Sequence, residues 1–172
     1  LTAGGQPSAV VEELLVDRRV WRERTPLDAP RHSAAAVNGP RPAEVDTQIQ
    51  QGWVIGGQRA GQVSASMVYY TRDQDYLRLL PELPEGRFMA AAQEADGLFY
   101  LFGGRSFRET QVVWAYDPET GRTVERAELP QIQNGLGSAV IDGLIYAVGG
   151  ANNFGIAVPW LHVYDPADDR WQ

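Results

Sequence analysis

Short apolar runs alternate with polar turn segments along the whole chain, and four of these runs end in a pair of glycines. The Gly-Gly pairs occur at residues 4–5, 56–57, 103–104 and 149–150. From the second glycine of one pair to that of the next, the steps are 52, 47 and 46 residues. A nearly constant period of this size is typical of proteins built from stacked copies of one supersecondary unit. The hydrophobic pattern therefore predicts a repeat protein.

Alignment on the double glycine divides each repeat into four short strands, here called strands a, b, c and d. Strand a consists of small apolar residues, and strand b is aromatic and apolar and ends in the double glycine. The expected ranges are 32–37, 88–92 and 137–141 for strand a, and 53–57, 98–104 and 144–150 for strand b. Between them lie Asn38-Gly39, Asp96-Gly97 and Asp142-Gly143. Such pairs favour two-residue antiparallel hairpins because both residues adopt positive φ.

Strands c and d follow a polar loop of variable length. The expected ranges are 11–17, 63–70, 111–117 and 160–165 for strand c, and 20–25, 76–80, 123–127 and 170–171 for strand d. Four antiparallel strands per repeat predict an all-β protein. A sheet that is apolar on both faces buries them when copies stack side by side around an axis, which is the arrangement of a β-propeller.

The repeat resembles the kelch repeat. The residues that carry the resemblance are Gly56, Gly57, Gly103, Gly104, Gly149, Gly150, Tyr116, Asp117, Tyr164, Asp165 and Trp171. We expect structural roles for them: the glycines permit close contact between neighbouring sheets, and the aromatic residues fill the space between these sheets. Repeat three carries Thr123 in place of the tryptophan, and repeat two lacks Tyr-Asp-Pro.

The resemblance implies a kelch-type β-propeller that is incomplete in this chain, with about three and a half four-stranded antiparallel blades. We expect one domain over residues 1–172, with a partial first blade at 1–27, blades at 31–80 and 87–129, and a partial fourth blade at 136–172. An incomplete ring leaves an apolar blade face exposed at each end. We therefore expect either that the remainder of the propeller belongs to a longer parent chain or that the chain self-associates.

Composition and charge exclude several classes of function. The net charge of −7 argues against nucleic-acid binding, and the absence of cysteine excludes disulfides and thiolate chemistry. The apolar runs are too short for a membrane span. The residues predict neither a catalytic set nor a metal site, and we expect no cofactor. The compartment stays undetermined, although the use of arginine alone among the basic residues favours a bacterial source, and we favour an extracytoplasmic location.

Arginine and asparagine concentrate in the b–c loops and the d–a links, which lie on one face of a propeller. The predicted ligand-binding residues are Arg31, Arg59, Arg87, Arg105, Arg108, Asn152 and Asn153. Guanidinium groups pair with carboxylates and sulfates, so this face is predicted to bind an acidic sugar or an acidic peptide. In the alternative interpretation, Arg31 and Arg87 tie loops together between blades, and the other arginines are solvated loop charges.

Four further features have simpler interpretations. His162 is expected to pack between blades, and His32 lacks a carboxylate partner that would indicate acid–base chemistry. Asp165, Asp168 and Asp169 fit a polar c–d turn rather than a cation site. About eleven extra residues follow Asn38-Gly39 and are expected to form a surface loop or a loop that docks a partner.

For function, the resemblance implies a non-catalytic binding or scaffold module for protein or glycan partners, acting through the b–c and d–a loop face. The alternative is part of a sugar-processing propeller enzyme similar to a sialic-acid epimerase. Acid–base residues on the loops of the missing part of the ring would favour the enzyme. Apolar or aromatic loop tips there would favour a docking surface.

Overall fold

The computed structural model describes residues 8–39, 51–72, 74–107 and 110–172, and all regular structure within them is β-strand. A two-stranded sheet, called blade 1, joins β1 (Val11–Leu15) and β2 (Val20–Arg24). Blade 2 contains β3 (Ala35–Val37), β4 (Gln51–Ile55), β7 (Met67–Thr71) and β8 (Tyr76–Leu80). Blade 3 contains β9 (Ala91–Ala95), β10 (Leu98–Phe102), β11 (Val113–Asp117) and β12 (Arg122–Arg126). Blade 4 contains β13 (Gly137–Ile141), β14 (Leu144–Val148), β15 (Leu161–Asp165) and β16 (Arg170–Trp171).

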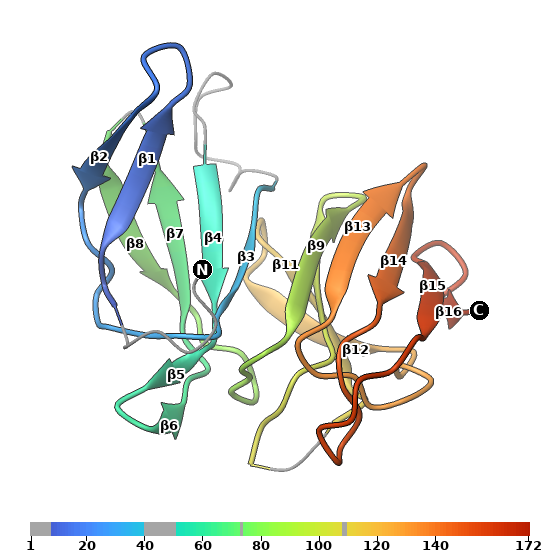
Figure 1. Ribbon diagram of the computed structural model, residues 1–172. Coiled ribbons are helices and arrows are strands. Elements are labelled where there is room, and N and C mark those ends of the chain that lie inside the picture. Colours follow the sequence, from blue (N-terminus) through green and yellow to red (C-terminus); the bar gives the residue numbers. More distant parts are fainter. Residues whose placement is uncertain (1–7, 40–50, 73, 108–109) are drawn as a thin grey trace.

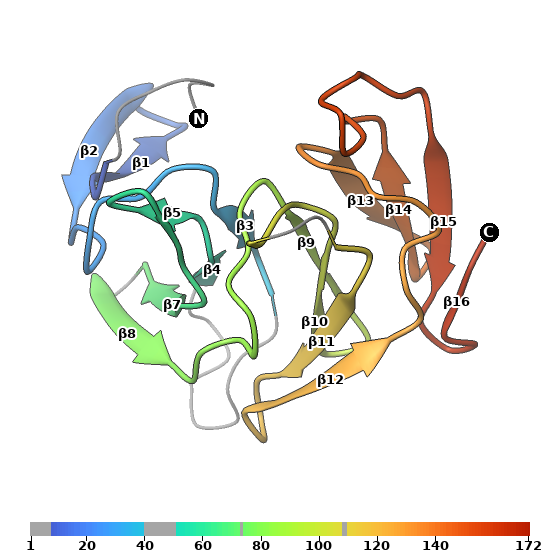
Figure 2. The ribbon, with the colours of Figure 1, turned by 90° about the horizontal axis from the view of Figure 1, so that it is seen from below.

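The strands within each four-stranded blade follow one another in the sheet in chain order, and every pairing is antiparallel. The first strand of blade 3, β9, contacts the first strands β3 and β13 of the two neighbouring blades, and the sheets fan outward from these strands to form an open arc (Figures 1 and 2). Three four-stranded blades and one hairpin confirm the predicted all-β architecture of about three and a half blades.

Aromatic residues fill the space between blades. Trp53 of blade 2 lies against Phe99 of blade 3, with ring centroids 4.3 Å apart. Between blades 3 and 4, Tyr100 meets Tyr164 at 5.5 Å, and the Trp171 indole N–H donates to the Ala127 carbonyl at 2.9 Å. Burial of such large side chains from both sheets is the main attraction that holds neighbouring blades together.

The second glycine of each described double glycine lies where a neighbouring backbone comes close. The Gly104 N–H donates to the Gln133 carbonyl at the start of the next blade, at 2.8 Å. Gly104 has a φ of +78°, and a Cβ there would lie 2.6 Å from the Phe88 carbonyl oxygen. Only glycine satisfies both conditions. Gly4 and Gly5 lie outside the described residues.

Several predicted strand limits differ from the structure, most of all in strand c of blade 2 and in strand a of blades 2 and 3, where β3 begins at Ala35 rather than at residue 32. Strand c of blade 2 was predicted to begin at Val63, but it begins at Met67. Instead, β6 (Gln62–Val63) pairs with β5 (Gln58–Arg59), because Ala60-Gly61 adopts positive φ and turns the loop back on itself. Strand a of blade 3 covers Ala91–Ala95 rather than 88–92.

The later start of strand a in blade 3 has a backbone cause. Met89 has a φ of 55°, which interrupts an extended strand. Ser33 and Gly135 occupy the same place in blades 2 and 4, with φ values of 54° and 62°. Hydrogen bonds join the three residues around the hub, from the Gly135 N–H to the Met89 carbonyl and from the Met89 N–H to the Ser33 carbonyl. The link residues before strand a therefore form a separate hydrogen-bonded layer.

Candidate functional site

The b–c loops and the d–a links lie at the same end of the sheets, the lower end in Figure 1. We call this surface the loop face. It comprises the described residues of 25–34, 56–66, 81–90, 103–112, 127–136 and 149–160. The c–d turns and the a–b turns of blades 3 and 4 lie at the opposite end. The predicted ligand-binding residues that the structure describes belong to the loop face, and Arg108 lies outside the described residues.

Arg31 is buried within the loop face, and its two Nη groups donate hydrogen bonds to other residues of the chain. Its Nη1 donates to the Gly56 carbonyl at 3.1 Å and to Ser66 Oγ at 3.0 Å. Its Nη2 donates to Asp28 Oδ1 at 2.6 Å, and Arg59 Nη2 lies 3.1 Å from Asp28 Oδ2. Burial lowers the pKa of Arg31, while the charge of Asp28 opposes that shift. Two guanidinium groups thus share one carboxylate, so this cluster attracts anions less than two free arginines would.

Arg87 repeats this arrangement in blade 3 at greater depth. Its Nη1 donates to the Val112 carbonyl at 2.8 Å and to the Gly103 carbonyl at 3.3 Å. Its Nη2 lies 3.9 Å from Glu85 Oε2. Burial lowers the pKa of Arg87 to about 10, with Glu85 opposing the shift, so the guanidinium remains charged at neutral pH. Its side chain therefore ties the d–a link to the end of strand b.

Blade 4 uses glutamine at the equivalent position. Gln133 is fully buried, and its Nε2 donates to the Gly149 carbonyl at 2.8 Å. Arg31, Arg87 and Gln133 thus each bind the carbonyl of the first glycine in their own blade. This shared contact gives the three side chains a common role in shaping the loop face.

The remaining predicted residues lie nearer the surface. Arg105 and Asn153 are exposed, and Asn152 is half-buried. The Asn152 side-chain oxygen accepts hydrogen bonds from the backbone N–H groups of Phe154, at 3.0 Å, and Ile156, at 3.1 Å. Asn152 therefore holds the shape of the blade 4 loop.

Large apolar side chains on the loop face were missed as site residues by the sequence prediction. Phe107 in the b–c loop of blade 3 is 90% exposed, and Phe154 in that of blade 4 is 79% exposed. Ile156 and Met89 are also exposed on this face. The available signal was the presence of phenylalanine and isoleucine within loops that are otherwise polar. These side chains protrude where the buried arginines do not.

The histidines and the C-terminal aspartates have structural contacts. His162 lies 6.3 Å from Trp160 and 6.5 Å from Trp171 between ring centroids, and burial lowers its pKa. Asp169 accepts hydrogen bonds from the Tyr164 hydroxyl at 2.6 Å and from the Ala127 N–H at 2.8 Å. Asp169 thus joins the c–d turn of blade 4 to blade 3. Within the described ranges, no group of three or more acidic or histidine side chains could hold a metal ion.

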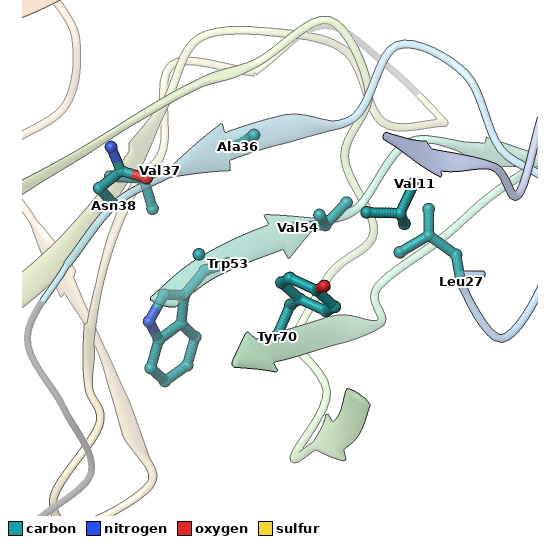
Figure 3. Close-up of a pocket in the computed structure, with 9 residues that line it drawn as sticks. Val11, Leu27, Ala36, Val37, Asn38, Trp53, Val54 and Tyr70 are labelled. Carbon is teal, nitrogen blue, oxygen red and sulfur yellow. The ribbon is translucent and has the colours of Figure 1, made fainter. Parts of the chain in front are cut away.

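A pocket of about 250 Å³ opens between blade 1 and blade 2 (Figure 3). Its lining is mostly apolar, and Val11 and Leu27 face Ala36 and Val54 across it. Tyr70 contributes the one titratable side chain among the lining residues. Burial, reinforced by the hydrogen bond from its hydroxyl to Asp75, raises the pKa of Tyr70 to about 12. A protonated phenol in an apolar pocket does not constitute an acid–base site.

Comparison with known proteins identifies the repeats. A model of the Kelch motif matches residues 86–122 and 134–172. These two segments are kelch repeats. They cover β9 to β11 of blade 3 and all four strands of blade 4, and together with the fan of antiparallel sheets they establish a kelch-type β-propeller fold. No helix in the described part of the chain has the length and apolarity to cross a membrane.

Several kelch proteins are similar to this chain. Kelch-like protein terF of Aspergillus terreus is 36% identical over 91 residues, which cover 48% of this chain and 20% of that protein. Kelch-like protein 40 of Xenopus tropicalis is 29% identical over 104 residues, which cover 58% and 17%. The solved structure of YjhT has a TM-score of 0.77 at 15% identity, covering 95% of this chain and 51% of that one. The chain therefore matches a fifth or less of these curated relatives and about half of the solved chain.

Proposed function

We propose that this kelch-repeat chain is a non-catalytic interaction module that binds partner proteins through the loop face. Its similarity to kelch-like proteins over two repeats supports a binding role. We choose the loop face and a protein ligand because the b–c loops of blades 3 and 4 have exposed apolar tips.

Exposed phenylalanine side chains favour a protein ligand because they gain the most from leaving water. Full burial of a phenylalanine side chain is worth about 1.5 to 3 kcal/mol, and aromatic anchors dominate the energy of protein interfaces. Phe107 and Phe154 protrude from equivalent loops of two neighbouring blades. Arginine is also enriched among such anchors, and Arg105 is exposed in the same loop as Phe107.

The buried polar residues of the loop face support these tips. Arg87 and Gln133 bind the carbonyls of Gly103 and Gly149, where the two b–c loops begin. A loop anchored at its base presents its apolar tip with less loss of conformational entropy on binding. The arginines that are predicted to bind an anion would therefore act mainly by holding the loops in place.

The test uses peptides selected from a random phage-displayed library on the immobilised chain. We expect the double substitution Phe107→Ala/Phe154→Ala to weaken binding of a selected peptide by about 30-fold or more, which corresponds to roughly 2 kcal/mol. Tyr76→Ala is the matched control, because Tyr76 is also exposed but follows the c–d turn of blade 2, at the opposite end of the sheet.

Titration calorimetry measures the affinities, and circular dichroism checks that each variant is folded. Peptides that bind the double variant as tightly as the unsubstituted chain would refute the loop face as the binding surface. Failure to select any peptide that competes for this surface would count against a protein ligand.

A further inference from the structure

An aspartate bonds the c–d turn of blade 2 to blade 1 at their outer strands. Asp75 Oδ1 accepts a hydrogen bond at 3.0 Å from the N–H of Thr25, the residue that follows β2. The same oxygen accepts a hydrogen bond at 2.8 Å from the hydroxyl of Tyr70 in β7. The Thr25 hydroxyl donates to the Asp75 carbonyl at 2.8 Å, and Arg24 Nε lies 3.9 Å from Asp75 Oδ1. One residue of the turn therefore joins two blades through its side chain and its backbone.

Blade 4 makes the same contact with blade 3. Asp169 Oδ1 accepts hydrogen bonds from the N–H of Ala127, which follows β12, and from the Tyr164 hydroxyl. Each aspartate stands five places after the tyrosine that it binds, and both have a positive φ, 48° at Asp75 and 50° at Asp169. An arginine ends the outer strand of the preceding blade in both cases, Arg24 in β2 and Arg126 in β12. We call these two sets the rim latches: Asp75 with Thr25 and Tyr70, and Asp169 with Ala127 and Tyr164.

The interface between blades 2 and 3 lacks both parts of the latch. Gly121 stands five places after Tyr116, with a φ of +70°, and brings no carboxylate. The residue that follows β8 is Pro81, which has no N–H to donate. A Cβ at Gly121 would lie 3.8 Å from the Pro81 Cγ, so the two positions face each other. The acceptor and the donor are therefore present together at two interfaces and absent together at the third, which indicates that they act as a pair.

The groups around Asp75 favour its ionised form. The Thr25 N–H, followed by the Tyr70 hydroxyl, lowers the pKa of Asp75 against a smaller opposing effect of burial, and the charge of Arg24 adds to the lowering. Arg24 Nε also lies 3.1 Å from Glu13 Oε2 of β1. Glu13 in turn pairs with two more arginines, Arg22 and Arg72. Among these groups, positive charge therefore exceeds negative charge.

The groups around Asp169 act in the same direction. Burial raises the pKa of Asp169, but the Ala127 N–H, the Tyr164 hydroxyl and Arg126 together outweigh burial. Tyr100 of β10 packs against Tyr164, with ring centroids 5.5 Å apart. Burial raises the pKa of both phenols, so they remain protonated at neutral and at acid pH. Asp169 is therefore the group of this latch that titrates in acid.

We propose that the two rim latches are acid-sensitive clamps between blades, which hold the c–d turn of one blade on the outer strand of the blade before it and release that turn when the aspartate is protonated. A neutral carboxyl group accepts a hydrogen bond from an N–H more weakly than a carboxylate does, and it loses the attraction of the arginine. A carboxyl group with a lowered folded pKa stabilises the fold above its unfolded pKa, and this contribution is lost as the pH falls through the folded value. The interface between blades 2 and 3 has no such group and should not respond.

Amide hydrogen exchange followed by NMR tests the release at the bonded atoms of the full chain. Between about pH 6 and pH 3, the protection of the Thr25 and Ala127 N–H groups, corrected for the intrinsic exchange rate at each pH, should fall at least about tenfold. The Gly104 N–H is the control, because it also crosses between blades 3 and 4 but donates to a backbone carbonyl, and its protection should fall by much less. In Asp169→Asn, which keeps an oxygen acceptor without a charge, the Ala127 N–H should lose this pH dependence while the Thr25 N–H keeps it. Equal falls at Ala127 and Gly104 would overturn the proposal.

The interface between blades 2 and 3 offers a test by gain of a latch. Pro81→Ala supplies the N–H and Gly121→Asp supplies the carboxylate, at a φ that aspartate tolerates. Urea unfolding at about pH 7 should show the two substitutions coupled, with the unfolding equilibrium constant of the double variant about tenfold below the value expected from the single variants. The coupling should shrink at about pH 3, where the introduced carboxyl group is protonated. Pro81→Ala with Gly121→Asn is the matched control and should show a weaker coupling that does not change with pH. Additive single substitutions at about pH 7, or a coupling of the same size at both pH values, would overturn the proposal.

Discussion

The substitution Gly104→Ala adds one methyl group at a position where glycine is needed for two reasons. The residue has a positive φ, and neighbouring backbone atoms lie close to it. An alanine there must adopt a φ of +78°, and its Cβ would lie 2.6 Å from the Phe88 carbonyl oxygen and 2.7 Å from the Ala90 nitrogen. The positive φ costs about 1 to 2 kcal/mol. Overpacking against backbone atoms, which cannot rotate away, adds about 1 to 3 kcal/mol. We expect Gly104→Ala to lower the free energy of unfolding by roughly 2 to 5 kcal/mol.

Gly143→Ala is the matched control, because Gly143 has a φ of +80° and no atom within 4 Å of an added Cβ. The free energy of unfolding of this variant should fall only by the cost of the positive φ, about 1 to 2 kcal/mol. For a chain of this size each kcal/mol lowers the melting temperature by about 2 to 4 °C. Urea unfolding followed by tryptophan fluorescence gives the free energies, at low protein concentration so that association does not contribute. Equal losses for the two variants would refute the role of the close backbone approach at Gly104.

Three further substitutions test the loop face and the contacts between blades. Met89→Gly removes a side chain from a residue with a φ of 55° and should raise the free energy of unfolding by up to about 1 kcal/mol. It should also weaken binding of the selected peptides, and an unchanged peptide affinity would exclude Met89 from the binding surface. Burial raises the pKa of Asp169, but the Ala127 N–H, the Tyr164 hydroxyl and a nearby arginine together outweigh burial, so the net shift is downward. A carboxyl group with a lowered folded pKa stabilises the fold above its unfolded pKa, and this stability is lost as the pH falls through the lower folded value. As the pH falls below about 4, the Asp169→Asn variant should therefore lose less stability than the unsubstituted chain. Urea midpoints of the two proteins that change in parallel from pH 6 to pH 2 would contradict this. Gln133→Arg places a charge at a fully buried position with no acidic residue two or three places before it. This substitution should lower the free energy of unfolding by roughly 3 kcal/mol or more. An unchanged melting temperature would show that the link accepts an unpaired guanidinium.

The fold was predictable from the sequence because its turns require particular residues. Asp96-Gly97 and Asp142-Gly143 adopt positive φ at both positions, as their residue types predict for two-residue hairpins. The strand limits were harder to place where a loop forms structure of its own. Ala60, for example, adopts a φ of 48° in the β5–β6 turn, and alanine carries no sequence signal for that conformation.

The candidate site was less predictable because sequence identifies a side chain but not its depth. Arg31 and Arg87 were placed on the correct face, yet their side chains point inward and bind backbone carbonyls. Phe107 and Phe154 lie on the same face and point outward. The structure therefore supports the alternative interpretation in which Arg31 and Arg87 tie loops together, and the exposure of the two phenylalanines had no counterpart in the sequence prediction.

A signal for the buried arginines is nevertheless present within the repeats. Asp28 stands three places before Arg31, and Glu85 stands two places before Arg87. Where blade 4 has the neutral Gln133, proline and glutamine occupy those two places. A buried guanidinium needs a nearby carboxylate, whereas a buried amide does not. The joint presence or absence of the acid and the arginine therefore indicates a buried pair.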